Sequence, residues 1–337
     1  MSCTPLECNE SQLFMKYRSS YTAAFYDFIR HMILTSATWY SIWYTQHTYW
    51  SVFPTILLGL LHVKTFIIFH DCGHHSYTPS RLINTIIGMT TGVIVGTPFS
   101  WGIRHDTHHA TSGNIENKYN WRQNEHIYYT VKTYRELPSI KRKLISILIS
   151  PEFFYTCMPF INFMLIERFS AIKLLYRKTR QHSQLGYLLA DQLIHNLLFY
   201  VYLCTLFQYG ILYHWTLSMW IASNIGVMLF HNQHTFNPPY IATNTTWSVK
   251  DSGIKGSSFI QIPAYLNYFT GGIEYHHIHH MNSKIPNYHL KEYHEEVIRT
   301  SNVFDTIYSM SMKEFYNNLW LVLYDEEKQK YVQLNYY

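Results

Sequence analysis

Residues 271–280 read GGIEYHHIHH, which places four imidazoles within five residues. Two similar clusters precede this stretch, HDCGHH at residues 70–75 and HDTHH at residues 105–109. Together with HNQH at residues 231–234, they hold 12 of the 21 histidines in this chain of 337 residues. Neutral imidazole is a common ligand of iron, zinc and copper. A catalytic zinc usually takes three protein ligands and a structural zinc four, so this many clustered histidines predicts a site for two metal ions.

The composition indicates a membrane protein. Aromatic residues make up 18% of the chain and charged residues only 14%, whereas soluble domains carry about 25% charged residues. The mean hydropathy of -0.12 is low because the many Tyr and His residues reduce it. The five cysteines lack CxxC spacing and indicate reduced thiols. A net charge of +5 without a dense basic face argues against nucleic-acid binding.

Four apolar segments are long enough to cross a hydrocarbon core of about 30 Å at ~1.5 Å per residue. They form two pairs, residues 25–45 with 50–69 and residues 186–209 with 211–230, each joined by a short turn. Four crossings return every histidine cluster to one side of the membrane. Inside the second span, Lys64 is expected to extend its amine toward the membrane surface.

Two further apolar runs are expected to lie at the membrane interface. A single crossing by residues 82–99 would put the first two histidine clusters on opposite sides, so a shared site requires an interfacial or re-entrant segment. Residues 144–166 have basic clusters on both sides, and basic residues favour the cytoplasmic face. Both ends of this run therefore prefer the same side.

We therefore predict an all-α integral membrane protein. Four transmembrane helices would form two hairpins, and a cytosolic helical cap would hold a di-metal histidine site. Residues 1–22 are predicted to form an N-terminal polar segment, which lacks the apolar stretch of a cleavable signal peptide. Residues 23–290 would form the membrane domain and residues 291–337 a C-terminal extension of the cytosolic cap.

The three clusters, written H-x-x-x-H, H-x-x-H-H and H-x-x-H-H, resemble in order and spacing the histidine boxes of the membrane fatty acid desaturase family. The resemblance covers about residues 60–290. Several flanking segments are most similar to the Δ12 (omega-6) acyl-lipid branch, namely Trp247, Gly256-Ser257-Ser258, residues 266–272 and Ile285-Pro286-Asn287-Tyr288.

Carried over box by box, the resemblance implies nine residues that bind metal and are therefore catalytic: His70, His74, His105, His108, His109, His234, His276, His279 and His280. Acidic and amide side chains beside the boxes are candidates to orient imidazole N–H groups: Asp71, Asp106, Glu274 and Asn114. Three more histidines, His75, His231 and His277, fit a structural role better. In acyl-CoA desaturases an Asn four residues before the ligand equivalent to His234 contacts a metal through water. Phe230 stands there in this chain, so that role is not carried over.

The resemblance implies two ferrous ions that use O2 and two external electrons to remove hydrogen from adjacent CH2 groups of an acyl lipid, leaving a cis double bond. A separate cytochrome b5 or ferredoxin is expected to supply the electrons and to dock near the basic segment 141–180, because the chain contains no His-Pro-Gly-Gly haem-binding signature. In a eukaryotic host the family implies the endoplasmic reticulum, with the active site on the cytoplasmic side.

Two alternatives stay open. Fatty acid hydroxylases, epoxygenases, acetylenases and carotenoid ketolases use similar boxes and diverge after the first hydrogen is removed, so the mass of the product distinguishes them. A histidine-rich metal transporter would need ionisable residues along its spans, whereas the histidines here gather at one membrane face.

Overall fold

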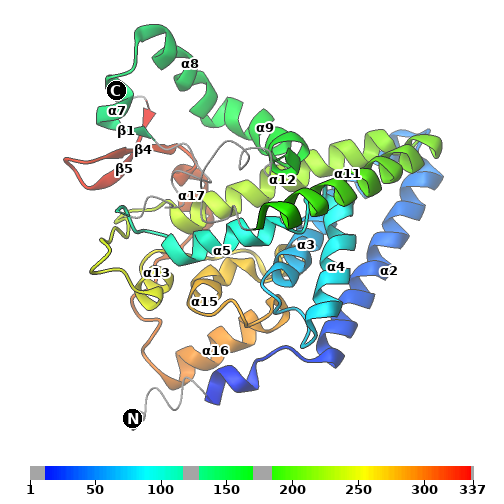
Figure 1. Ribbon diagram of the computed structural model, residues 1–337, viewed down its shortest axis with the longest axis horizontal. Coiled ribbons are helices and arrows are strands. Elements are labelled where there is room, and N and C mark those ends of the chain that lie inside the picture. The colour runs from blue at the N-terminus through cyan, green and yellow to red at the C-terminus, as the bar shows by residue number, and fades with distance from the viewer. Residues whose placement is uncertain (1–11, 117–128, 170–183, 335–337) are drawn as a thin grey trace.

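The computed structural model describes residues 12–116, 129–169 and 184–334. Four long helices form its framework (Figure 1): α2 (Tyr21–Thr45), α3 (Val52–Gly73), α11 (Leu185–Gln208) and α12 (Leu212–His234). They coincide with the four predicted spans to within a few residues. The turn after α2 contains the short helix η1 (Tyr49–Ser51), and its Gln46 side chain lies against Gly210 in the turn after α11. The two hairpins therefore meet at one end.

Among the described residues, two of these helices are long and apolar enough to cross a membrane, at Tyr49–Gly73 and Leu185–Gln208. A bent pair, Ser139–Ile149 with Pro151–Phe169, makes a third candidate if it counts as one span. α2 and α12 are long enough but contain more polar residues, such as Asp27 and His31 in α2. The protein therefore has two or three candidate spans by length and composition, and the four-span topology stays a prediction.

The first predicted interfacial run forms α4 (Arg81–Val95), which packs along α3. Its 15 residues are too short to cross the hydrocarbon core at ~1.5 Å per residue. The helix ends at Gly96, whose φ of 69° is a left-handed conformation that glycine adopts without strain. The chain then turns back into α5 (Trp101–Thr111), where Gly102 lies against Gly73 at the end of α3. The first two histidine boxes are thereby brought together.

The second predicted interfacial run is broken into α8 (Ser139–Ile149), α9 (Pro151–Ile161), the π-helical turn η2 (Asn162–Ile166) and η3 (Glu167–Phe169). The axis bends by 76° at the break, where Ser150 precedes Pro151 and takes an extended conformation, as residues before proline do. This agrees with the prediction that the run is not one straight crossing. Residues 170–180 of the predicted basic segment lie outside the described residues.

The fold is mostly helical, as predicted, but it is not purely α, because the cap also contains short strands in two small sheets. β4 (Leu321–Asp325) and β5 (Lys330–Gln333) form an antiparallel hairpin, and β1 (Tyr129–Thr130) pairs with β4 in parallel. β2 (Phe259–Ile260) pairs in parallel with β3 (Ser309–Met310). The runs LVLY and YV around a polar turn favour strands, and Leu323 and Val332 pack onto Val131.

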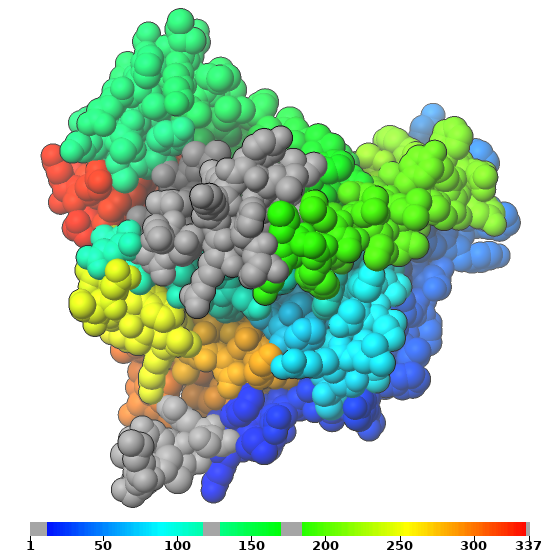
Figure 2. Space-filling model, viewed as in Figure 1, coloured from blue at the N-terminus to red at the C-terminus, as the bar shows by residue number. Residues whose placement is uncertain are grey.

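Short helices form the rest of the cap: α7 (Val131–Arg135), α13 (Val249–Ile254), η5 (Ala264–Leu266), α14 (Asn267–Thr270), η6 (Ile273–Tyr275), α15 (His276–Met281), η7 (Asn287–His289), α16 (Leu290–Thr300) and α17 (Met312–Asn318). α16 packs Leu290, Tyr293 and Val297 against Tyr17 of the N-terminal segment. Residues 1–11 of that segment lie outside the described residues. The turn that connects α11 to α12 projects at one end of the molecule, whereas the cap lies at the other end (Figure 2).

Candidate metal centre

The structure brings all nine predicted ligands together in two adjacent groups. The first group consists of His70, His74, His105, His109 and His279, and the second of His108, His234, His276 and His280. Within each group the candidate ligand atoms lie within 4.8 Å of one another. The His109 and His280 rings connect the groups, with centroids 4.2 Å apart. The arrangement therefore offers two metal positions side by side.

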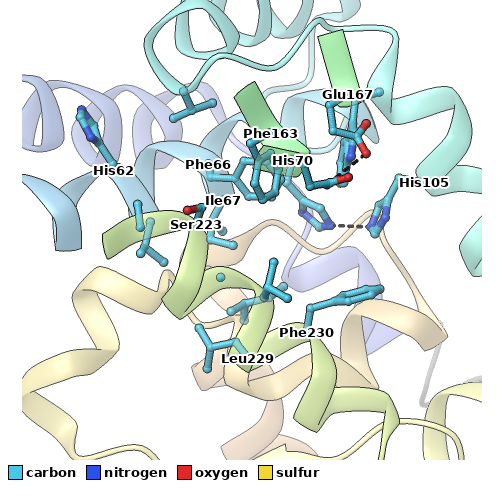
Figure 3. A pocket seen from close by; sticks show the side chains of 18 of the residues that line it. His62, Phe66, Ile67, His70, His105, Phe163, Glu167, Ser223, Leu229 and Phe230 are labelled. Atoms are coloured by element: carbon cyan, nitrogen blue, oxygen red, sulfur yellow. Dashed lines mark hydrogen bonds between the residues drawn. The ribbon is translucent and has the colours of Figure 1, made fainter. Parts of the chain in front are cut away.

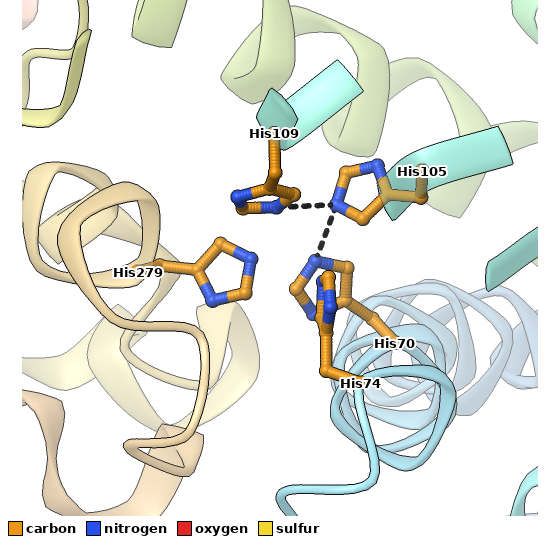
Figure 4. A group of neighbouring side chains, drawn as sticks. All are labelled: His70, His74, His105, His109 and His279. Atoms are coloured by element: carbon orange, nitrogen blue, oxygen red, sulfur yellow. Dashed lines mark hydrogen bonds between the residues drawn. The ribbon is translucent and has the colours of Figure 1, made fainter. Parts of the chain in front are cut away.

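The first group is built from three segments (Figure 4). α3 contributes His70 in its last turn and His74 directly after its end, and a spacing of four residues stacks these rings on one helical face. α5 supplies His105, whose Nε2 lies 2.8 Å from Nε2 of His70 and 3.2 Å from Nε2 of His109. His279 comes from α15. Three of the Nε2 atoms therefore converge.

The second group has four converging Nε2 atoms. Nε2 of His108 on α5 lies 3.1 Å from that of His234, the last residue of α12, and 3.2 Å from that of His280 on α15. Nε2 of His234 lies 2.9 Å from that of His276. α5 therefore serves both groups.

These donors fit metal ions. Two ligands at right angles, each about 2.1 Å from a metal, are ~3.0 Å apart, close to the observed separations. Nε2 of His74 and Nε2 of His279 are buried and have no hydrogen-bond partner among the described residues, although buried polar atoms are normally paired. Burial, together with neighbouring histidines, holds the pKa of His105 and that of His279 well below the ordinary range. These rings are therefore neutral, which is the form that binds metal.

Among the described residues, hydrogen-bond acceptors face the Nδ1 atoms of His70, His74 and His234. Asp71 Oδ1 lies 3.2 Å from His70 Nδ1, and Asp106 Oδ1 lies 3.1 Å from His74 Nδ1. Both positions suit the orienting role expected for these carboxylates. The carbonyl oxygen of Gly256 lies 3.0 Å from His234 Nδ1. The Gly256 contact was not predicted, because a backbone acceptor leaves no signature in side-chain chemistry.

Glu274 is placed differently from the prediction. Its buried carboxylate accepts hydrogen bonds from Asn267 and from Thr270 Oγ1, the latter over 2.6 Å. Among the described residues, it therefore stabilises the turn before the third box instead of orienting an imidazole.

The histidines that were expected to be structural make other contacts. His277 Nε2 lies 3.1 Å from His294 Nδ1, and His231 Nε2 lies 2.9 Å from the carbonyl oxygen of Asn318. His75 takes a positive φ of 52° just after the first box. Asn114, also considered for orienting an imidazole, donates to Asn244 Oδ1 over 3.1 Å.

A mainly apolar cavity lies between α3, α12 and the η2 turn and extends to both groups (Figure 3). His70 and His105 of the first group and His276 of the second line it. Its far part reaches His62. Most of its walls are apolar: Val63, Phe66, Ile67, Phe163, Ile166, Met219, Val227, Leu229 and Phe230. No cavity residue could be assigned from the sequence, because the walls come from segments far apart in the chain.

Aromatic rings pack against histidines of both groups. Trp101 stacks on His105 with ring centroids 4.4 Å apart. The Phe230 ring lies 5.2 Å from that of His108 and 5.3 Å from that of His234. An apolar ring, four residues before His234, thus packs against one histidine from α5 and one from α12.

A family model described as "Fatty acid desaturase" matches residues 47–309. A fatty acid desaturase of Bacillus subtilis (strain 168) is 31% identical over 281 residues, 82% of this chain and 76% of that protein. An endoplasmic reticulum omega-3 fatty acid desaturase of Vigna radiata is 26% identical over 274 residues, 77% of this chain and 66% of that protein. An sn-1 oleoyl-lipid 12-desaturase of Picosynechococcus is 23% identical over 252 residues, 74% of this chain and 68% of that protein.

Two shorter matches have names that specify an electron donor. An acyl-lipid omega-3 desaturase (cytochrome b5) of Arabidopsis thaliana aligns with 32% of this chain, and an sn-1 acyl-lipid omega-3 desaturase (ferredoxin) of Nostoc aligns with 33%. The family match spans most of the chain and includes all nine histidines of the two groups. The chain therefore belongs to the fatty acid desaturase family, and it is an O2-dependent oxidoreductase of the membrane.

Proposed function

We propose that this desaturase holds two iron ions with its nine grouped histidines and introduces a cis double bond at the Δ12 (omega-6) position of a lipid-bound acyl chain. The observation that carries the proposal is the apolar cavity lined by histidines of both groups. Such a cavity suits a hydrocarbon chain, and its end at the two metal positions would put two adjacent CH2 groups beside them.

The protein contributes ligands, orientation and exclusion of water. Imidazole nitrogen suits iron, and the bound iron pair would supply the activation of O2. Asp71 and Asp106 would hold two of the ligand rings by their Nδ1 atoms. Phe66 and Phe230 line the cavity next to the histidines and would keep water away from the reacting carbons.

The Δ12 position is supported by the segments that resemble the omega-6 branch and by one relative named as a 12-desaturase. Three relatives are named as omega-3 desaturases, so a double bond three carbons from the methyl end is the closest different outcome. A hydroxylated or epoxidised acid, or a ketolated carotenoid, would instead assign the chain to a sister activity with the same histidine boxes.

We also propose a separate electron donor, cytochrome b5 or ferredoxin, in line with the names of two relatives. The described part of the predicted docking segment carries Lys141, Arg142 and Lys143 on α8. In a eukaryotic host we expect the endoplasmic reticulum membrane, with the metal centre on the cytoplasmic side.

Expression in yeast tests the proposal, with the total fatty acids analysed by gas chromatography and mass spectrometry. The intact chain should produce a diunsaturated acid with its new double bond at Δ12. His276→Ala should abolish the product, because His276 belongs to the second group and lines the cavity. His47→Ala, at an exposed histidine outside both groups, should leave the yield unchanged. An unchanged profile from well-expressed intact chain would contradict the proposed substrate and position.

A further inference from the structure

A row of buried polar side chains leads from the N-terminal part of α2 to the first group of histidines. It begins at Asp27 on α2, continues through Lys64 on α3 and Asn287 in η7, and ends at Asp71 beside His70. Each of these residues is at most 4% exposed. Lys64 therefore does not extend toward the membrane surface, and that prediction was wrong. Lys64 and Asp71 are two helical turns apart, on the same face of α3.

Both polar atoms of the Asn287 carboxamide form hydrogen bonds within this row. Its Oδ1 accepts a hydrogen bond from Lys64 Nζ, and its Nδ2 donates to Asp71 Oδ2 over 2.8 Å. The backbone N–H of Asn287 donates to the same carboxylate oxygen over 2.6 Å. Since Asn287 belongs to the cap, its contacts join the cap to α3.

The chemistry of the neighbours determines which way the carboxamide faces. The Lys64 ammonium can only donate and the Asp71 carboxylate can only accept, so Oδ1 must face Lys64 and Nδ2 must face Asp71. Asp27 balances the buried charge of Lys64, because its Oδ2 lies 3.1 Å from Lys64 Nζ. The same oxygen accepts a hydrogen bond from Tyr77 Oη over 3.0 Å. An unpaired charge at this depth would be unfavourable.

The row ends on a predicted metal ligand. Asp71 Oδ1 lies 3.2 Å from His70 Nδ1, whereas His70 Nε2 faces His105 in the first group. An N–H at Nδ1 that donates to Asp71 leaves the lone pair of Nε2 directed at the metal position. Asn287 fixes the other carboxylate oxygen and so prevents Asp71 from rotating away from His70.

We propose that Lys64 and Asn287 are positioning residues for the metal in the first group: they hold Asp71 against His70 and thereby make binding of that metal depend on docking of the cap on α3. The proposal rests on the proposed di-iron function. The row does not include the histidines of the second group, where His234 Nδ1 faces the carbonyl oxygen of Gly256. Disturbing the row should therefore weaken one metal position selectively.

Asn287→Ala tests the proposal in the purified full chain, because it removes both side-chain hydrogen bonds and keeps the backbone N–H. The readout is iron per chain after equilibration with increasing concentrations of a chelator. We expect the variant to keep one metal with the affinity of the unaltered chain and to bind the other about 10–100-fold more weakly, the usual effect of losing an outer partner of a ligand. In Co2+-loaded protein, the absorption bands of only one ion should change.

Two further variants separate positioning from general docking of the cap. Tyr288→Phe removes the neighbouring 2.8 Å hydrogen bond from η7 to the carbonyl oxygen of Tyr77 without touching Asp71, and both metals should stay bound as in the unaltered chain. The double variant Lys64→Met with Asp27→Asn removes both members of this ion pair together. This double variant should reproduce the selective weakening seen with Asn287→Ala.

Each other result overturns a defined claim. Unchanged affinity for both metals in Asn287→Ala would exclude a role for the row. If Tyr288→Phe weakened metal binding as much as Asn287→Ala does, the effect would be assigned to docking of the cap alone. If the unaltered chain bound no metal, the di-iron function itself would be wrong, and the positioning role would be excluded with it.

Discussion

At the scale of single residues, histidines close together in the sequence face different surroundings. His234 Nε2 points into the second group while its Nδ1 faces the carbonyl oxygen of Gly256. His231, one helical turn earlier on α12, instead points its Nε2 at the carbonyl oxygen of Asn318, 2.9 Å away. Both side chains are buried, so burial alone does not distinguish a metal ligand from a structural histidine. The direction of the ring does.

This difference predicts opposite results for two alanine variants. His234→Ala should remove one metal per chain and lower desaturation by more than the ~10–100-fold typical of an outer partner, because it deletes a proposed direct ligand. His231→Ala should keep both metals and lower the stability by about 1–3 kcal/mol, since it removes the partner of a buried carbonyl. Metal analysis, product yield and thermal unfolding in detergent measure these effects. Equal loss of metal in both variants would contradict the division into ligand and structural roles.

At the scale of elements, α12 forms one wall of the proposed acyl site and ends in a metal ligand. Gly226 lines the cavity, and a Cβ atom added there would meet no atom within 4 Å. Gly186 near the start of α11 is equally unobstructed but is exposed on the outside. The open side of Gly226, inside α12, faces the cavity, whereas that of Gly186, in the first turn of α11, faces the outside.

Leucine substitutions at these glycines test whether the cavity binds substrate. Gly226→Leu should stabilise the fold by roughly 0.5–1 kcal/mol, because glycine is unfavourable inside a helix, and Gly186→Leu, in the first turn of α11, by no more than this. Gly226→Leu should nevertheless reduce desaturation by about a hundredfold, since a shift of ~1 Å in the reacting carbons has this effect. Gly186→Leu should retain the activity of the unaltered chain. Full activity in Gly226→Leu, at equal protein level, would exclude the cavity as the acyl site.

At the scale of the whole molecule, the polar residues of α2 lie on its inner side. Asp27 pairs with Lys64, and His31 Nε2 lies 2.9 Å from Thr65 Oγ1 on α3. The side of α2 turned away from the protein exposes apolar residues, including Phe25 and Ile33. A helix with its polar groups satisfied inside the protein and apolar side chains outside suits contact with lipid. This distribution supports α2 as a span even though its average composition is only moderately apolar.

The four-span topology predicts that the two turns and the cap lie on opposite sides of the membrane. In a chain whose five cysteines are replaced, and whose activity is confirmed, His47→Cys and Tyr209→Cys should react with a membrane-impermeant thiol reagent from one side. Glu295→Cys on α16 should react only from the other side. Labelling of positions 47 and 295 from the same side in sealed vesicles would contradict four crossings.

The sequence by itself determined the features that depend on neighbouring residues. The i, i+4 spacing of the boxes places two rings on one helical face whatever the rest of the chain does, so the clustering of the box histidines was predictable. The set of nine, which includes His234 outside the boxes, was implied by the resemblance to the family. The length of the apolar runs likewise predicted the four long helices. Strands β4 and β5 were missed because a pair of short strands is stabilised by its partner and by the residues that it covers.

Only the tertiary structure decided how these parts meet. Which histidines form each group, the burial of Lys64 against Asp27, and the contact of Asn287 with Asp71 depend on segments separated by many residues. The sequence predicted an extended Lys64 because a lone lysine in an apolar span is stabilised by reaching water. In the folded chain the carboxylate of Asp27 and the carboxamide of Asn287 take the place of that water. The periodicity of one helix contains no information about a partner from another segment.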